Sequence, residues 1–557
     1  MKLITFFLLL ALYPPVRAVE LLDQDDVIRI VEQAASYARR ASPKSRIAIV
    51  DRQGYVLGVW DMTSSDENPV LNGGDLGKRR NGKVVTAITR ATTAAFLSSA
   101  ENAFTSRTAG FIIQQHFPPG VMNTPPGPLV GVGFSNFFVG GGNNSDVNFA
   151  KQIPFDGFNP GIPNVLFPKA SFVPANPFRS PGTFGLGVPL GTLSDSPGGV
   201  PLYKGGECVG GIGVCGDGSP TDLSVALAFL RGFSLPKSTP SFKTGDDSDE
   251  GVARAGQRGY GPNPGITADK VFLGGIRIPY VKTEFDDVDA ESIDDLPGRW
   301  VPGNIKNPNF PAGDDPGFPP RKSPPVFPYE VRKFGGYEGE VRFPLRDDPT
   351  PGRINGVKRL EKEEVEKIIE LAAERAKSTR AGIRLPIGVP AKVFISVVGN
   401  PGVHGKKPPI LGIFRTGEAT VFSWDVAVQK ARTALFFSSN DLAFSTRTVG
   451  FLAQRNYPPG LDGRRPGPYF GLQESITVVG NGNVPNGITI FPGGFPLYRN
   501  GQLVGAIGVS GDGVDQDDII SISGVKEFKA PVGIRADQFT YDGARLPYVK
   551  FPRDPNN

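Results

Sequence analysis

Residues 96–120 read FLSSAENAFTSRTAGFIIQQHFPPG, and residues 436–460 read FFSSNDLAFSTRTVGFLAQRNYPPG, so that 13 of 25 positions are identical. A second block follows in each copy: GGVPLYKGGECVGGIGVCGDG (198–218) matches GGFPLYRNGQLVGAIGVSGDG (493–513) at 14 of 21 positions. Solenoid repeats are much shorter, roughly 20–50 residues. The repeat therefore predicts two homologous globular domains in tandem.

The spacing of the blocks predicts an insertion in the first copy. The first pair is offset by 340 residues and the second by 295, a difference of 340 − 295 = 45 residues. The extra residues fall at about 138–195, a stretch rich in Gly, Asn, Pro and Phe. It could clamp the two copies together, form an oligomer contact, or be a surface excursion without a role.

Hydrophobic periodicity predicts the first half of each copy. Apolar residues recur at helical spacing over 23–41, and two β-rich runs at 46–51 and 55–60 flank a turn, Arg52-Gln53-Gly54. A second helix is predicted at 84–99. The corresponding segments of the second copy are 360–377, 392–399, 410–416 and 424–439.

The second half of each copy completes the predicted fold. The glycine-rich block predicts a hairpin whose glycines allow close packing of a helix on the sheet. A short helix is expected near Thr221 or Asp515, and then a last strand, RIPYVK (277–282) or RLPYVK (545–550). Hairpin-sized connections favour antiparallel pairing, so the predicted class is α+β, with helices packed on a small antiparallel sheet.

The N-terminus has the pattern of a cleaved signal peptide. Lys2 precedes an apolar run at 3–12, and Val16-Arg17-Ala18 offers a cleavage site after Ala18. The run is too short to span a bilayer, and no later segment is apolar enough, so we expect a secreted or periplasmic protein that does not span the membrane. The predicted segments are a signal peptide (1–18), domain 1 (19–284), a Pro/Asp-rich linker (285–356) and domain 2 (357–557).

Composition excludes some classes of partner and cofactor. The net charge is +5, and Lys and Arg form no long basic run, so nucleic acid is not an expected partner. The only cysteines, Cys208 and Cys215, lie seven residues apart in one predicted strand. This spacing should place them on opposite faces and too far apart for a disulfide. No Cys-x-x-Cys-His motif occurs, which excludes covalent c-type haem.

Two motifs of the second copy resemble a known family. The hairpin GGFPLYRNGQLVGAIGVSGDGVDQDD (493–518) and the helix motif Lys430-Ala431-x-Thr433-Ala434 resemble the signature of the GlcG/HbpS-like haem-binding or haem-degrading domain. The first copy keeps Ala91, Thr93 and Ala94 but has Arg90 for the lysine and Cys215 for the serine of the hairpin.

The resemblance implies a profilin-like fold in each copy, a five-stranded antiparallel sheet between helices. It also implies oligomers and non-covalent binding of haem, here haem b or a similar small planar ligand, outside the cytoplasm. The chain departs from the family in fusing two domains with extra loops.

The scarce histidines are candidate iron ligands. His116 lies in the QQHFPPG stretch of the first repeated block, near an expected helix end, and a neutral imidazole can ligate haem iron. Its equivalent in the second copy is Asn456, and a surface or capping role is the alternative. His404 lies in a loop without a counterpart in the first copy.

Three duplicated pairs are further candidates for binding haem. Tyr203 and Tyr498 could bind ferric iron as tyrosinates, or could be half-buried strand residues with bonded hydroxyl groups. Arg107 and Arg447 could hold a propionate with their planar guanidinium groups, or could bond backbone carbonyls. The threonines Thr108 and Thr448 stand beside these arginines.

Three functions are weighed. The first is an exported, non-catalytic protein that binds haem or a related tetrapyrrole. The second is a structural or oligomerisation module with no retained ligand. The third, ranked last, is a haem-degrading or small-metabolite enzyme, because duplicated Ser98, Ser99, Ser438 and Ser439 have no repeated histidine to activate them.

Overall fold

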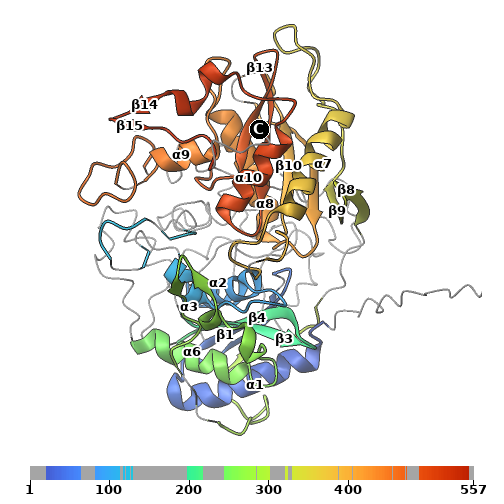
Figure 1. The fold of residues 1–557 in the computed structure, drawn as a ribbon. Coiled ribbons are helices and arrows are strands. Elements are labelled where there is room, and N and C mark those ends of the chain that lie inside the picture. The colour runs from blue at the N-terminus through green and yellow to red at the C-terminus, as the bar shows by residue number, and fades with distance from the viewer. Residues whose placement is uncertain are drawn as a thin grey trace, which may run out of the picture.

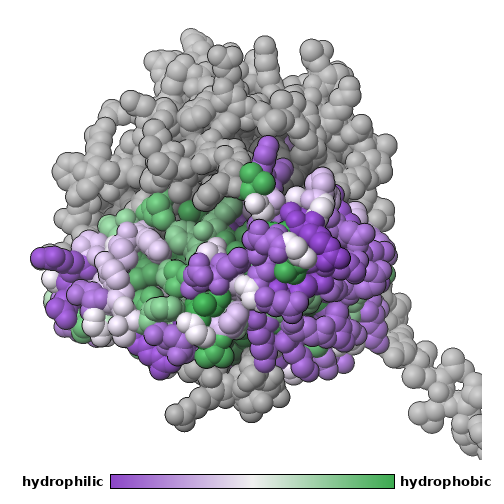
Figure 2. Space-filling model, turned by 90° about the horizontal axis from the view of Figure 1, so that it is seen from above, coloured by the Kyte–Doolittle hydropathy of each residue, from purple (hydrophilic) through white to green (hydrophobic). Residues whose placement is uncertain are grey.

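The computed structural model places two domains side by side, with the first domain in blue to green and the second in yellow to red (Figure 1). Seen from the second domain's end, hydrophobic residues gather beside a larger hydrophilic area (Figure 2).

The structure describes residues 21–63, 82–112, 117–118, 121–129, 197–216, 244–301, 320–323, 329–472 and 488–550, except 55, 126, 284, 286, 387, 404–405, 455 and 471.

The first domain is an antiparallel sheet between helices. Its strands run in the order β3-β4-β1-β2-β7, with α2 on one face and α1 and α6 on the other. The main elements are α1 (Gln24–Ala41), β1 (Arg46–Asp51), β2 (Val56–Asp61), α2 (Gly82–Leu97), α3 (Ser106–Ile112), β3 (Gly199–Lys204), β4 (Glu207–Cys215), α6 (Thr244–Gly256), β5 (Phe272–Leu273), β6 (Ile276–Arg277) and β7 (Arg299–Trp300).

The second domain repeats this arrangement with one more strand. Its sheet has the order β12-β13-β10-β11-β9-β8, with α8 on one face and α7 and α10 on the other. The main elements are β8 (Glu330–Phe334), β9 (Tyr337–Phe343), α7 (Lys362–Ser378), β10 (Phe394–Gly399), β11 (Ile410–Thr416), α8 (Phe422–Phe436), α9 (Thr446–Leu452), β12 (Gly494–Arg499), β13 (Gln502–Ser510), α10 (Val514–Gly524), β14 (Thr540–Tyr541) and β15 (Ala544–Arg545).

The α+β prediction is confirmed, and the two sheets share one register. Ile49 of β1 pairs with Ile212 of β4, and Val397 of β10 pairs with Ile507 of β13 at the corresponding place. The glycine-rich hairpins behave as expected. A Cβ on Gly213 would overlap the carbonyl oxygen of Ala87 in α2, and one on Gly508 would overlap that of Ala427 in α8. The helices thus approach the sheets at distances that only glycine permits.

The cysteines do not form a disulfide, as predicted, but the expected opposite faces are wrong. Both thiols are buried and free, and both belong to the apolar cluster that includes α2. A β-bulge explains the difference, because the register shifts beside Tyr203 and leaves Val209 unpaired. The extra residue restores Cys208 to the face of Cys215. The same register shift recurs beside Tyr498.

The predicted last strand is wrong in both copies. Only Arg277 and Arg545 lie in strands, each in a two-residue hairpin outside the main sheet. The carbonyl groups that follow accept hydrogen bonds from side chains, Pro279 O from Thr108 and Pro547 O from Thr448. Proline has no N–H to donate to a neighbouring strand, which disfavours regular pairing here.

The segment 285–356, predicted to be a linker, contributes strands to both sheets. β7 pairs with β2 in the first domain, while β9 pairs with β11 and β8 with β9 in the second. The helix expected near Thr221 lies outside the described residues. The first domain's counterpart of α10 is α6, which starts at Thr244. The signal peptide and the 138–195 insertion also lie outside the described residues.

The two domains contact each other at several places. Phe96, near the end of α2, stacks on Phe422 at the start of α8, with ring centroids 6.3 Å apart. The turns after the repeated blocks also meet. Asn123 N donates to the Asp462 carboxylate at 2.9 Å, and Asp462 N donates to Asn123 Oδ1 at 3.1 Å. Contact between the same turn of each copy is typical of a two-fold pair, so the chain resembles a covalently joined dimer.

Candidate ligand sites

The duplicated tyrosines are buried and hydrogen-bonded at equivalent places. The hydroxyl of Tyr203 donates to Ser99 O at 2.7 Å, and that of Tyr498 donates to Ser439 O at 2.6 Å. Burial raises the pKa of both phenols above the usual value. The hydroxyl of Tyr203 holds the turn after α2, and that of Tyr498 holds the turn after α8. The raised pKa of both phenols disfavours the tyrosinate form.

The duplicated arginines are paired with carboxylates of the next helix. Arg107 binds Glu250 of α6 with both arms, Nε at 2.7 Å and Nη2 at 3.1 Å. Arg447 donates from Nε to Asp518 and from Nη2 to Asp515, both in α10 and each at 2.7 Å. Internal carboxylates therefore already bind both guanidinium groups. The neighbouring Thr108 and Thr448 donate their hydroxyls to backbone carbonyls at 2.7 and 2.6 Å.

A second duplicated ion pair lies deeper, and the sequence did not reveal it. Arg90 Nη1 contacts Asp249 Oδ2 at 2.7 Å and donates to Val214 O at 2.6 Å, with both charged side chains fully buried. In the second domain, Lys430 Nζ contacts Asp517 at 2.7 Å and Val509 O at 2.8 Å. Lys430, the lysine of the motif that resembles the family signature, therefore links α8 to β13 and α10. The sequence could have revealed this pair through the segments RIPYVK and RLPYVK, which are 268 residues apart. The same offset aligns Asp249 with Asp517.

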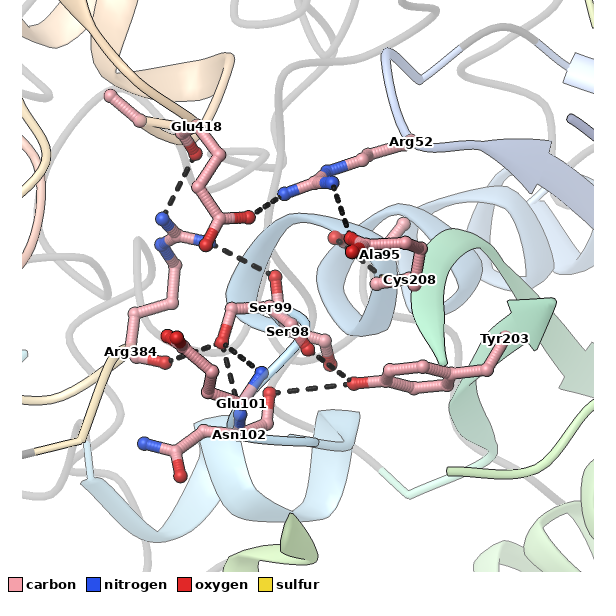
Figure 3. A network of polar contacts seen from close by, with 12 residues as sticks. Arg52, Ala95, Ser98, Ser99, Glu101, Asn102, Tyr203, Cys208, Arg384 and Glu418 are labelled. Atoms are coloured by element: carbon pink, nitrogen blue, oxygen red, sulfur yellow. Dashed lines mark hydrogen bonds and ion pairs between the residues drawn. The ribbon is translucent and has the colours of Figure 1, made fainter. Parts of the chain in front are cut away.

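A polar network joins the two domains (Figure 3). Glu418 of the second domain forms an ion pair with Arg52 of the first, and Arg384 Nη1 donates to Ser98 O at 3.2 Å. Ser99 Oγ donates to Arg384 O at 3.0 Å, and Asn102 donates to Ile383 O at 3.3 Å.

The charges of this network stabilise one another. Burial opposes ionisation of Glu418, but Arg384 and Arg52 outweigh it and hold the pKa of Glu418 below its usual range. Burial also raises the pKa of the nearby Cys208 thiol to about 11, so this cysteine is not an activated thiol. Sequence reasoning missed Arg52, Arg384 and Glu418, because none of them is repeated in the other copy.

The second domain has a pocket at the corresponding place. Its volume is about 330 Å³, at the small end of the range for ligand sites. Its wall consists of carboxamides, hydroxyls and apolar groups, with Lys406 as its one charged residue among those that the structure describes. The wall is made by Ile354, Asn355, Asn400, Pro401, Gly402, Val403, Lys406, Pro408, Leu435, Phe436, Ser438, Ser439, Asn440, Gln502 and Leu503.

Asp512 anchors the loop that carries Arg384. Its Oδ1 accepts from Leu385 N at 3.1 Å, and its carbonyl accepts from Gly382 N at 2.9 Å. Its Oδ2 accepts no hydrogen bond from the described residues. Burial raises the pKa of this carboxyl to about 7, although Arg384 and the hydrogen bond from Leu385 N oppose the shift.

Asp512 therefore makes stability depend on pH. A carboxyl whose pKa is higher in the folded state binds its proton more tightly there, so it favours folding at low pH. This contribution declines from about pH 4 and is lost above about pH 7. We expect Asp512→Asn to abolish this decline, a difference on the order of 2 kcal/mol between pH 5 and pH 8. Urea denaturation at both pH values measures it, and an equal pH slope in both proteins would refute it.

The described residues give haem iron few ligands. The tyrosine hydroxyls already donate to carbonyls, and both cysteines are buried in the core. No group of three or more His, Cys, Asp or Glu suited to a metal occurs in the described part of the chain. His116 and His404 lie outside the described residues, although Val403 and Lys406, on either side of His404 in sequence, line the pocket. Over the described ranges, no helix has the length and apolar character needed to cross a bilayer.

One known protein family matches a part of the second domain. Residues 360–526 match the family described as haem degrading protein HbpS-like. This match lies within the second domain and confirms the resemblance given by its hairpin and its lysine motif. No curated protein matches the chain.

Several solved structures match a part of the chain. A PduOC:heme complex is 22% identical over 31% of this chain and 98% of its own, with a TM-score of 0.22. Klebsiella pneumoniae protein ORFY is 24% identical over 31% of this chain and 92% of its own, with a TM-score of 0.22. A double mutant of Streptomyces reticuli HbpS is 21% identical over 32% of this chain and 94% of its own, with a TM-score of 0.21.

Proposed function

We propose that the protein binds haem, or a closely related tetrapyrrole, without a covalent bond. The observation that carries this proposal is the match of residues 360–526 to the HbpS-like haem-degrading family. The buried tyrosines and paired arginines make poor ligands, so coordination of iron falls to a histidine. His116 is our proposed ligand, and His404, beside the pocket in sequence, is the alternative.

Titration with haemin tests the proposal. We expect the purified full chain to sharpen and shift the Soret band until it saturates. His116→Ala should weaken binding at least tenfold, because loss of an axial ligand removes the strongest single contact. His404→Ala is the matched variant, and it should bind normally if His116 is the ligand. No Soret change in the wild-type protein would refute haem binding.

The same experiment separates a binder from an enzyme. The matched family is described as haem degrading, which favours catalysis as the second candidate function. With a reductant and oxygen present, a binding protein should keep its Soret band over hours. Progressive loss of the band, with a matching yield of a cleaved tetrapyrrole, would instead assign haem degradation.

Export and self-association belong to the same proposal. We propose that a signal peptide is removed after Ala18 and that the mature protein acts outside the cytoplasm, where free haem would be captured. N-terminal sequencing of the natively produced protein should begin at Val19. A homo-oligomer is expected from the family resemblance, and light scattering with and without residues 138–195 tests whether the insertion contributes to it.

A further inference from the structure

We infer that the pocket of the second domain binds a small molecule that carries both a guanidinium and a carboxylate group. The first domain provides the precedent, because its corresponding site already holds the guanidinium of Arg384. This inference is independent of haem binding.

The two places correspond residue by residue. Ser98 and Ser438 occupy the same position of the repeated block. Arg52 N and Asn400 N each donate to the bulge carbonyl of the glycine-rich hairpin at 3.0 Å. The tyrosine of each hairpin donates to the carbonyl of the second serine. The pocket of the second domain and the polar network at the first domain therefore occupy equivalent places in the two copies.

In the first domain, a segment of the second domain fills the site. The Arg384 guanidinium donates to Ser98 O at 3.2 Å and to Glu418 O at 2.9 Å, and the side chain is almost fully buried. The Ser98 carbonyl belongs to the turn that follows α2, where the last carbonyl groups of a helix lack partners in the helix and favour a cation.

In the second domain, no residue that the structure describes takes the place of Arg384. Arg384 belongs to the long connection 379–393 between α7 and β10, whereas the first domain joins α1 to β1 with residues 42–45 alone. Ser438, the counterpart of Ser98, lines the pocket, and its carbonyl accepts no hydrogen bond from the described residues. As far as the described residues show, the duplicated site is filled by Arg384 in the first copy and unfilled in the second.

The wall of the pocket defines the ligand class. Ser438 lines the pocket and is the counterpart of Ser98, whose carbonyl accepts from the Arg384 guanidinium. Lys406 forms no ion pair with the part of the chain that the structure describes, so its ammonium group can pair with a carboxylate. The other polar side chains of the wall are neutral carboxamides and hydroxyls, so they add no charge. A volume of about 330 Å³ suits a molecule of the size of free arginine rather than a tetrapyrrole.

Isothermal titration of the full chain with L-arginine tests the inference. We expect one site per chain, and at least tenfold weaker binding of L-citrulline, whose uncharged ureido group replaces the guanidinium. Val403→Trp should fill the pocket and weaken L-arginine binding at least tenfold. Val331→Trp is the matched control, because Val331 on β8 is equally exposed (61% against 60%) and does not line the pocket. Lys406→Ala should weaken L-arginine but not methylguanidine, which has no carboxylate.

A second variant tests the precedent itself. Arg384→Ala should vacate the first domain's site, so that the number of L-arginine sites rises from one to two and guanidinium ion restores lost thermal stability. Absence of L-arginine binding by the wild-type chain would overturn the inference, as would binding that Val403→Trp leaves unchanged. If Arg384→Ala does not fold, the comparison of Val403→Trp with Val331→Trp still decides. Haemin titration of Val403→Trp reports on the haem proposal separately.

Discussion

Replacing Gly508 with alanine is expected to destabilise the second domain by roughly 3 kcal/mol or more, since overpacking a tight core forces the backbone to shift. The added Cβ would overlap the carbonyl oxygen of Ala427 and crowd the N–H of Ala431, both in the backbone of α8. A helix backbone cannot move aside as a flexible side chain can. Urea denaturation monitored by circular dichroism would show the loss as a lower midpoint.

The control for this variant is Gly533→Ala. Gly533 lies in a short 3₁₀ turn, and an added Cβ there would contact nothing within 4 Å. Its midpoint should stay close to that of the wild-type protein. If Gly508→Ala were as stable as Gly533→Ala, the close packing of α8 on the hairpin would be wrong.

Replacing Asp249 with alanine is expected to cost about 3–5 kcal/mol, the usual effect of leaving a buried charge without its partner. Asp249 contacts the Arg90 guanidinium, and both side chains are fully buried. Its other oxygen accepts from Gly216 N at 2.8 Å, so the variant also leaves a main-chain donor unpaired. Thermal and urea denaturation of the full chain would both measure the effect.

Asp269→Ala provides the matched comparison. Asp269 also pairs with cations, Lys270 at 2.8 Å and Arg277 at 3.0 Å, but its side chain is 31% exposed. Exposed pairs contribute about 1 kcal/mol or less, so this variant should be nearly as stable as the wild-type protein. Equal losses at positions 249 and 269 would contradict the burial of the Arg90–Asp249 pair.

Much of the fold could be predicted because the same local sequence patterns occur in both copies. Helical and strand periodicity placed α1, β1, β2 and α2, and the hairpin glycines predicted close helix packing. The segment RIPYVK looked like a strand because its residues are β-formers. Its carbonyls are instead held by hydroxyl groups such as that of Thr108, a tertiary contact that no local pattern encodes.

The candidate sites were harder to predict because their partners are distant in sequence. The extra 295 − 268 = 27 residues between hairpin and helix in the first copy hid the match of Asp249 and Glu250 to Asp517 and Asp518. The arginines were expected to bind a propionate or backbone carbonyls, and the structure pairs both with internal carboxylates. Arg384 lies 286 residues from Ser98 and has no counterpart in the first copy, so neither repeat nor spacing could reveal it.

The central claim is that two copies of one fold form a single body, with the second copy closing the site of the first. Scanning calorimetry of the full chain tests it most directly. The account predicts one cooperative transition whose calorimetric and van't Hoff enthalpies agree, and a shift of that whole transition to lower temperature in Arg384→Ala. Two separate transitions in the wild-type protein, with only one altered by the substitution, would contradict it.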